Sequence, residues 1–189
     1  MRNLLGSVAV LVASLLFAGG AAAVEPTTKP AAGADFVVSD MRVQTLAGGT
    51  YLYGTTETTF TDIKKAIDGL MPKVDKALAD GTAREVGGVL FLYEHVTDMN
   101  AKFTLSIGVV TPEGQKSVGD LKVKKLESYR CATVIYSGKL ESIPEAYNRL
   151  MGALGAAKLE PVGHSREYYL HWKGETSPNN VVLIAMGVK

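Results

Sequence analysis

The sequence predicts an α+β fold in which one structural module occurs twice. Segments 41–109 and 121–188 repeat the same order of patterns about 80 residues apart: an alternating strand, a short strand closing on glycine, an amphipathic helix and two more strands. This long period, with several elements in each copy, indicates a duplicated module and not a solenoid, whose repeats are shorter and more numerous. Because pockets often form between packed units, we expect a site between the copies.

Each copy opens with two short strands. Residues 41–46 and 121–126 alternate in polarity, and residues 51–54 and 134–138 form the aromatic segments that end on glycine. Alternation over so few residues is typical of strands with one buried face.

A capped amphipathic helix follows in each copy. The first begins at the capping box Thr59–Asp62 and carries apolar residues at spacings of three and four; the second begins at Ser142–Glu145, with Pro144 in its first turn. Pro72 lies inside the first helix, where we expect a kink or a break because proline lacks the amide donor.

The closing strands of the two copies differ. Residues 103–109 alternate between apolar and polar side chains, whereas residues 181–188 are apolar at both alternating sets of positions. A strand that is apolar on both faces is expected to be covered on both. Since helices can cover only one face, we expect the other face of the second copy to form the floor of a pocket.

The N-terminal residues are not expected to belong to the fold. Residues 1–23 have one early positive charge, an apolar run and small residues before a cleavage point, as in a secretory signal peptide, and residues 24–35 have the composition of a flexible linker. The alternative of a retained anchor is disfavoured because the run at 4–18 is shorter than the roughly 20 residues of a membrane span. We predict export to the periplasm or secretion from a bacterium, with no stable membrane anchor after cleavage.

The domain is then residues 36–189, with repeat one at 36–112 and repeat two at 119–189. After cleavage, basic and acidic residues are equal in number, which argues against a nucleic-acid partner. Cys131 is the single cysteine, so no intramolecular disulfide can form. The three histidines lack the spacing of metal ligands, and we predict no metal and no cofactor; haem is an alternative, although the sequence singles out no axial ligand from His95, His164 and His171.

Several segments of the second copy occur together in a recognisable order, at 131–138, 143–147, 159–163, 166–170 and 182–188. In this order they resemble the GyrI-like family, which includes gyrase-inhibitory proteins, stand-alone small-molecule binders, and the effector-binding domains of AraC-type and multidrug-sensing transcription regulators. The resemblance covers nearly all of residues 36–189. It implies two strand-helix-strand-strand modules related by a pseudo-twofold axis, which form a concave antiparallel sheet with both helices on one face. It also implies a groove in which ligands stack on aromatic side chains.

The sequence departs from the family at one position. The resemblance implies a glutamate in the closing strand of the second copy, where it would pair with cationic ligands and, in members reported to hydrolyse cyclopropane compounds, serve as an acid. Leu183 stands there in this chain, and Thr104 occupies the equivalent position of copy one. We therefore expect a neutral groove.

The candidate ligand contacts are mostly aromatic, because a ring offers apolar area with a polar handle. Tyr169 matches the family tyrosine, and its neighbour Tyr168 must point to the opposite face. For any one of these residues, a place in the ordinary core is the commoner outcome. The predicted contacts are Tyr53, Tyr93, Tyr136, Tyr169, Trp172 and Leu183.

These observations leave three hypotheses. The first is an exported domain that holds a small hydrophobic or aromatic molecule; export would separate it from gyrase and from transcription. The second is a hydrolase of a hydrophobic, cyclopropanoid-type compound, in which Glu94 or Glu167 replaces the missing acid. The third is a partner-binding domain whose groove is filled by its own side chains.

Overall fold

The computed structural model describes residues 36–189, so the predicted signal peptide and linker lie outside the described residues. One nine-stranded antiparallel sheet has the order β1-β7-β9-β8-β4-β5-β3-β6, and β2 also pairs with β7. Two α-helices, α1 (Ile63–Ala79) and α2 (Ile143–Ala156), accompany it, and a short 3-10 turn (Leu140–Ser142) precedes α2. The predicted α+β class is confirmed. The strands are β1 (Phe36–Val38), β2 (Arg42–Leu46), β3 (Gly49–Thr58), β4 (Val89–Glu94), β5 (Phe103–Thr111), β6 (Lys122–Leu126), β7 (Tyr129–Gly138), β8 (Pro161–His171) and β9 (Asn180–Val188).

The two copies exchange their opening strands. β2 comes from the first copy but pairs with β7 of the second, while its counterpart β6 pairs with β3 of the first. The central junction is made by β4 and β8, which pair from Val89–Tyr169 to Tyr93–Ser165. β1 of the first copy also pairs with β7, so four strand pairings join the two copies in one sheet.

The sheet is strongly curled. Lys124 on β6 reaches Glu94 on β4 at 3.1 Å, although β3 and β5 lie between those strands. In a flat sheet, three steps of about 4.8 Å would separate the two strands. The face that carries these two side chains is therefore the concave one, and we call it the inner face.

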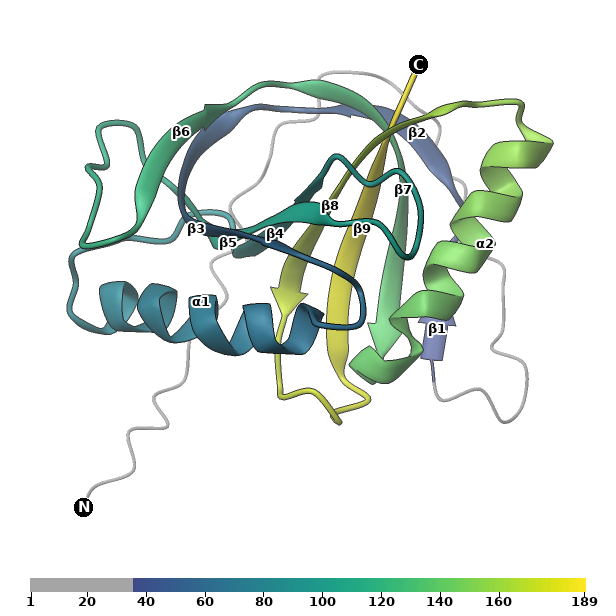
Figure 1. Ribbon diagram of the computed structural model, residues 1–189. Helices are drawn as coiled ribbons and strands as arrows, with labels where there is room; N and C mark the ends of the chain where they lie inside the picture. The colour runs from purple at the N-terminus through teal and green to yellow at the C-terminus, as the bar shows by residue number, and fades with distance from the viewer. Residues whose placement is uncertain (1–35) are drawn as a thin grey trace.

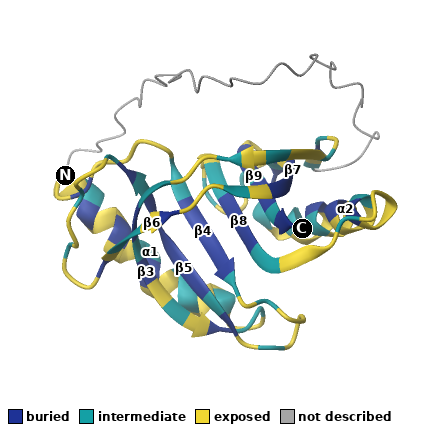
Figure 2. Cartoon of the chain, turned by 90° about the horizontal axis from the view of Figure 1, so that it is seen from above, coloured by how far each residue is buried: buried dark blue, intermediate teal, exposed yellow. Residues whose placement is uncertain are grey.

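Both helices lie outside the curl, with α1 below the central strands and α2 beside them in Figure 1, while β6 and β2 arch over the inner face. We call the side that carries the helices the helix face. Two large apolar clusters lie there: α2 buries Leu150 and Leu154 against Val182 and Ile184 of β9, and α1 packs Leu70 against the central strands. The strands of the centre are the most deeply buried part of the chain (Figure 2).

Tyr169 joins these clusters, because it packs against both the α2 cluster and the α1 cluster. Its neighbour Tyr168 packs on the inner face with Tyr51, Leu90 and Leu92. The predicted opposite orientations of Tyr168 and Tyr169 are thus confirmed. The seam between the copies, on the helix face, is where Tyr169 lies.

The predicted capping boxes are not formed at the helix starts. The N-cap residues are Asp62 for α1 and Ser142 for α2, and neither side chain makes a capping hydrogen bond. The amide of Asp62 donates to Thr59 Oγ1 at 3.3 Å in the turn that precedes α1, and Pro144 lies in the first turn of α2 as expected. Pro72 lies within α1, which continues from Ile63 to Ala79 as one helix, so the break that we considered does not occur. Within residues 36–189, no helix has the length and apolar character needed to cross a membrane.

Candidate functional site

Glu167 is a charged residue buried on the helix face. It lies on β8 between Phe91 of β4 and Ile184 of β9, and only 3% of its surface is exposed. Its place on the β4–β8 junction puts it at the seam between the two copies. A buried carboxylate is costly without hydrogen-bond partners, so the identity of those partners is the central question about this site.

Three tyrosine hydroxyls converge on this carboxylate. Oε2 accepts hydrogen bonds from Tyr93 at 3.0 Å and Tyr169 at 2.9 Å, and Oε1 accepts one from Tyr147 at 2.8 Å. The donors come from β4, β8 and α2, so the carboxylate ties the helix to both copies' central strands. Three donors directed at one carboxyl group favour its ionised form, which has only acceptor sites.

The electrostatics of the site follow from burial. Burial raises the pKa of Glu167 above its usual range near 4.5, and the three phenol hydrogen bonds oppose that rise. Burial also raises the pKa of Tyr93, Tyr147 and Tyr169, with the nearby Glu167 charge adding to the effect, so all three stay protonated donors. Among the described residues, no lysine or arginine forms an ion pair with Glu167. The site therefore holds a negative charge with donors but no cation.

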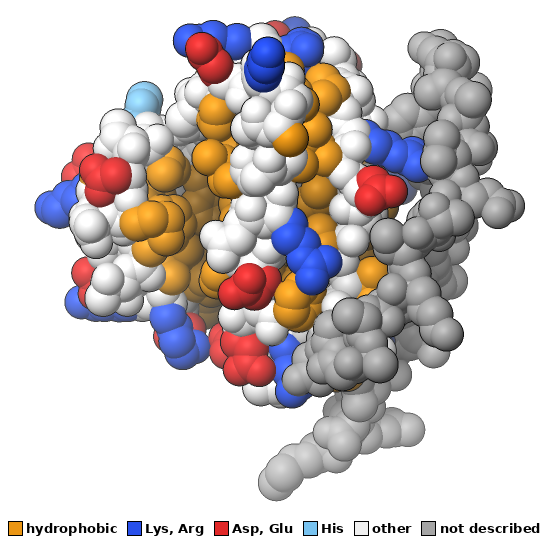
Figure 3. Space-filling view, turned by 90° about the vertical axis from the view of Figure 1, so that its right-hand side faces the viewer, with side chains coloured by type: hydrophobic (Ala, Val, Ile, Leu, Met, Phe, Trp, Pro, Cys, Tyr) orange, Lys and Arg blue, Asp and Glu red, His pale blue; other side chains and the backbone are white. Residues whose placement is uncertain are grey.

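Aromatic rings surround this carboxylate. The Tyr169 ring lies 4.7 Å from the Phe91 ring and 5.7 Å from that of Trp172, which meets it edge-on, and Phe60 stacks at 6.5 Å from Tyr93. Trp172 is half exposed, so the aromatic cluster reaches the surface. Figure 3 views the side of the molecule that carries α2 and shows apolar side chains gathered in strips there. An exposed ring such as that of Trp172 offers apolar area to a ligand at the surface.

The structure brings only some of the predicted contacts together. Tyr93, Tyr169 and Trp172 gather around Glu167, whereas Tyr53 lies on the inner face, stacked on Tyr51 at 5.1 Å. Tyr136 is fully buried in the α2 cluster, and its hydroxyl donates to the carbonyl of Lys139. The two tyrosines lie on opposite faces: Tyr136 packs in the α2 cluster together with its pairing partner Val182, whereas Tyr53 packs with the inner-face residues Tyr51 and Leu90.

Leu183 also lies away from Glu167. It pairs with Tyr168 on β8 and Ile135 on β7, all three on the inner face. The leucine at this position therefore does not determine the charge of the helix-face site. The neutral groove was expected on the face that the helices leave uncovered, and Leu183 lies on that inner face. Glu167 adds a feature that was not expected, an acid buried on the opposite, helix face.

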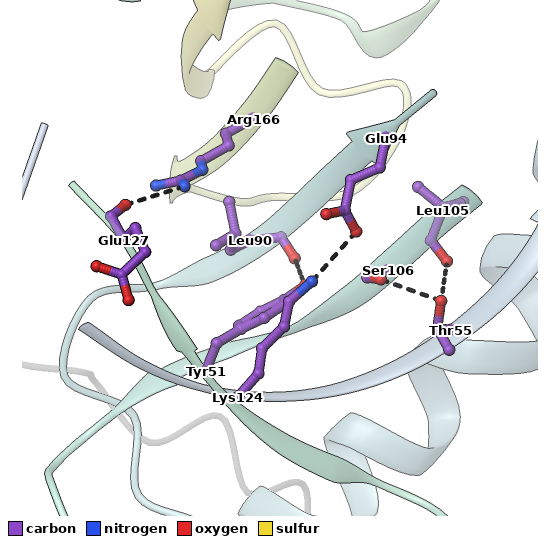
Figure 4. A network of polar contacts seen from close by, with 9 residues as sticks. All are labelled: Tyr51, Thr55, Leu90, Glu94, Leu105, Ser106, Lys124, Glu127 and Arg166. Atoms are coloured by element: carbon purple, nitrogen blue, oxygen red, sulfur yellow. Dashed lines mark hydrogen bonds and ion pairs between the residues drawn. The ribbon is translucent and has the colours of Figure 1, made fainter. Parts of the chain in front are cut away.

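The other candidate acid, Glu94, lies on the inner face. Its carboxylate pairs with Lys124 at 3.1 Å, close to the buried Tyr51 hydroxyl that donates to the Leu90 carbonyl at 2.8 Å (Figure 4). Arg166 lies in the same network. The two acids that the sequence could not separate thus face opposite sides of the sheet, one paired and one without a cation.

Tyr147 was not among the predicted contacts. In the sequence it belongs to the apolar stripe of the second helix, where a tyrosine is indistinguishable from an ordinary core residue. A buried phenol needs a hydrogen-bond acceptor, so the position of Tyr147 in an apolar stripe could have indicated that a polar group is buried opposite it.

The histidines and the single cysteine of the chain are possible metal ligands. Within residues 36–189, no three histidine, cysteine, aspartate or glutamate side chains lie close enough to hold a metal ion. His164 stacks on Tyr129 at 4.7 Å, and burial and the nearby Arg166 lower its pKa. Cys131 is a buried free thiol on β7.

The chain belongs to the GyrI-like family: the family model of the GyrI-like small molecule binding domain matches residues 39–186, well over half of the chain. The matched range includes Glu167 and all three of its phenol donors. No curated protein sequence matches the chain.

Similar solved structures agree with this assignment in fold. A structure of SAV2435 bound to tetraphenylphosphonium superposes with a TM-score of 0.60 at 17% identity, over 79% of this chain and 94% of that one. The EcmrR–DNA complex gives a TM-score of 0.62 at 16% identity; the match covers 82% of this chain but only 58% of EcmrR. A hydrolase from Listeria innocua gives 0.52 at 14% identity, over 79% of this chain and 91% of that one.

Proposed function

We propose that this GyrI-like domain binds a small hydrophobic, aromatic molecule that carries a positive charge, at Glu167 on the helix face. The observation that carries the proposal is the carboxylate that accepts three phenol hydrogen bonds and has no cationic partner among the described residues. The hydrophobic and aromatic character of the ligand follows from the rings around it. The charge is a revision of the neutral ligand expected from Leu183.

A cation gains from this site without touching the carboxylate. At about 6–8 Å and an effective dielectric constant near 20, two opposite unit charges attract by roughly 2–3 kcal/mol. Rings between ligand and acid add to this attraction, because the face of an aromatic ring also attracts cations. A relative in fold, SAV2435, was solved with tetraphenylphosphonium, a lipophilic cation of this kind.

Direct contact would require a tyrosine to move. Glu167 is 3% exposed, and Tyr147 on α2 is the donor that joins the carboxylate to the helix. Trp172 and Tyr169, by contrast, connect the buried acid with the surface. We therefore place the apolar body of the ligand against these two rings.

Two ions of the same shape test the proposal. Tetraphenylphosphonium and tetraphenylborate differ in the sign of their charge, so calorimetry on residues 24–189 should show at least about tenfold tighter binding of the cation. Equal affinities, or tighter binding of the borate, would sink the proposal. A rise in melting temperature with the cation should accompany binding.

A hydrolase is the second candidate, because Glu167 is an acid whose pKa burial raises and which lies beside phenols. Such a group suits general acid catalysis. Hydrolysis of cyclopropanoid esters by the purified domain should then disappear in Glu167→Gln and persist in Glu94→Gln. Turnover that survives Glu167→Gln would remove this candidate.

We also propose that the protein is exported, on the composition of residues 1–23. Mass spectrometry of the protein from a bacterial periplasmic or secreted fraction should give a mature N-terminus near Val24. An intact Met1 on protein retained in the cytoplasm would contradict this.

A further inference from the structure

Arg166, the residue before Glu167 in the sequence, is a buried cation on the inner face. Arg166 lies on β8 between Leu92 of β4 and Ala185 of β9, and it is 4% exposed. Its guanidinium lies 3.9 Å from the centre of the Tyr129 ring. Because the ring covers one face of the guanidinium, hydrogen-bond acceptors can reach its N–H groups only in the guanidinium plane.

The hydrogen bonds of Arg166 are incomplete. One terminal nitrogen donates to the Glu127 carbonyl at 3.2 Å, and the other reaches the Tyr168 hydroxyl at a long 3.4 Å. Nε is buried and has no acceptor; among the described residues it is the single buried side-chain nitrogen or oxygen left without one. A guanidinium has five donors, and here both of its acceptors are neutral groups.

Among the described residues, Arg166 forms no ion pair within 4 Å. Glu94, an acid of the same network, is paired with Lys124 instead. Glu127 accepts from Arg166 through its backbone carbonyl, and its carboxylate points away from the guanidinium (Figure 4). Burial and the nearby Arg166 lower the pKa of His164, which stacks on Tyr129. A buried charge in such a state is costly, so an anion would gain from pairing with it.

An apolar strip adjoins this cation. In the register of the sheet, Tyr168 neighbours Leu183, Leu183 neighbours Ile135, and all three share the inner face with Arg166. Ile135 is 46% exposed and Leu183 is half-buried. The second apolar face of β9 is therefore left partly uncovered at these positions by residues 36–189.

We propose that Arg166 and this strip form a second ligand site, on the inner face, for a small organic carboxylate with an apolar body. The carboxylate takes the Nε and terminal N–H groups at the edge of the guanidinium, where it replaces the long contact with the Tyr168 hydroxyl. The apolar body lies on Leu183 and Ile135. The site is separate from the cation site at Glu167, because the two lie on opposite faces of β8.

A pair of naphthalene probes tests the proposal in the wild-type protein. Naphthalene-2-carboxylate and naphthalene-2-methanol share the apolar body and differ in the charged group. We expect the carboxylate to bind at least about tenfold more tightly, as for hydrogen bonds to a charged group. Equal affinity for the two probes overturns the proposal.

Variants locate the preference. Arg166→Gln should abolish the preference for the carboxylate, while Arg149→Gln, which removes an exposed arginine on α2, should preserve it. A preference that survives in Arg166→Gln overturns the proposal. Tetraphenylphosphonium binding should be unchanged in Arg166→Gln, and carboxylate binding unchanged in Glu167→Gln, so failure of either site is recognised independently of the other.

A second pair keeps the test valid if Arg166→Gln does not fold. Ile135→Asp and Ile135→Asn remove the same apolar surface at an exposed position, and only the first adds a negative charge. We expect Ile135→Asp to bind naphthalene-2-carboxylate at least about threefold more weakly than Ile135→Asn does, by repulsion near the strip. Equal binding by the two variants places the carboxylate elsewhere and overturns the proposal.

Discussion

Arg166 and Glu167 are adjacent on β8 and oppositely charged, and they differ in how completely their hydrogen bonds are satisfied on the two faces of the sheet. On the helix face, Glu167 has three donors with normal hydrogen-bond lengths from three elements. On the inner face, Arg166 has two neutral acceptors, one of them distant, and an unpaired Nε. The alternation of a strand places neighbours on opposite faces, so consecutive charges need not form a pair. The buried anion on the helix face has a full set of hydrogen-bond donors, whereas the buried cation on the inner face lacks some of the acceptors that it needs.

The two candidate acids show the same contrast between the faces. Glu94 on the inner face is paired with Lys124, a partly buried lysine, whereas Glu167 on the helix face has phenols alone. A paired acid has little charge left for a ligand. Substitutions that treat the two acids alike should therefore have unlike effects.

The largest expected effect is that of Glu167→Gln on cation binding. Loss of the charge should weaken tetraphenylphosphonium binding by about 30-fold, the equivalent of ~2 kcal/mol of Coulomb attraction. Glu94→Gln is the matched control and should change the affinity less than about threefold. Calorimetry measures both, and equal losses would contradict the distinction between the faces.

The next effect is a pH dependence of the same binding. Because burial raises the pKa of Glu167 above about 4.5, protonation as the pH falls through that raised value removes the negative charge. Tetraphenylphosphonium affinity should fall about tenfold between roughly pH 8 and pH 4.5 in the wild type. The affinity of Glu167→Gln should stay flat over this range, and a parallel decline in that variant would assign the titration to another group.

A smaller effect concerns stability. Tyr147→Phe removes a donor to a charged acceptor and should lower the free energy of unfolding by about 1.5–3 kcal/mol at neutral pH. The loss should shrink at acidic pH, because the carboxyl group is then protonated and needs the phenol less. Tyr51→Phe is the inner-face control: its hydroxyl donates to the Leu90 carbonyl, so its loss of about 1 kcal/mol should not vary with pH. Urea denaturation followed by circular dichroism measures both, and identical pH profiles would argue against an ionised Glu167.

The smallest expected effect comes from Leu183→Glu. From the sequence, an acid at this position should shift preference toward cations; from the structure, it should change tetraphenylphosphonium affinity at Glu167 by less than about twofold, because Leu183 faces the inner side. Leu183→Gln controls for lost apolar surface. A large gain in cation binding in the glutamate variant alone would place the ligand on the inner face.

Local periodicity predicted the fold class and the duplication, whereas the concave sheet with both helices on one face came from the resemblance to the GyrI-like family. The repeated order of strands and helices predicted two copies in an α+β arrangement, and alternation predicted that Tyr168 and Tyr169 face opposite sides. The exchange of β2 and β6 between the copies was not predictable, because the alternation of a strand does not show which other strand it pairs with.

The site could be predicted only in part, for a related reason. Period-two alternation says that Leu183 and Ile184 point to opposite faces, but not which face carries the helices. Glu167 was a weak candidate since most charged strand residues are solvated, and its burial depends on Tyr93 and Tyr147, which lie 74 and 20 residues away in sequence. Such contacts arise from tertiary structure, which leaves no local pattern.

The adjacent charges of β8 also bear on how the strand finds its place during folding. A slip by one residue would exchange the faces of all the side chains of β8. The Arg166 guanidinium would then face the phenol groups of Tyr93 and Tyr147, and the Glu167 carboxylate would face the Glu127 carbonyl that now accepts from Arg166. Both misplacements would leave a buried charge facing groups of the wrong kind, so the slipped pairing is strongly disfavoured. The irregular pairings at Pro161–Ser165 and Tyr169–His171 bracket the stretch in which this matters. The adjacent Arg166 and Glu167 thus favour the observed register of β8 over the slipped one, whatever ligand the folded domain binds.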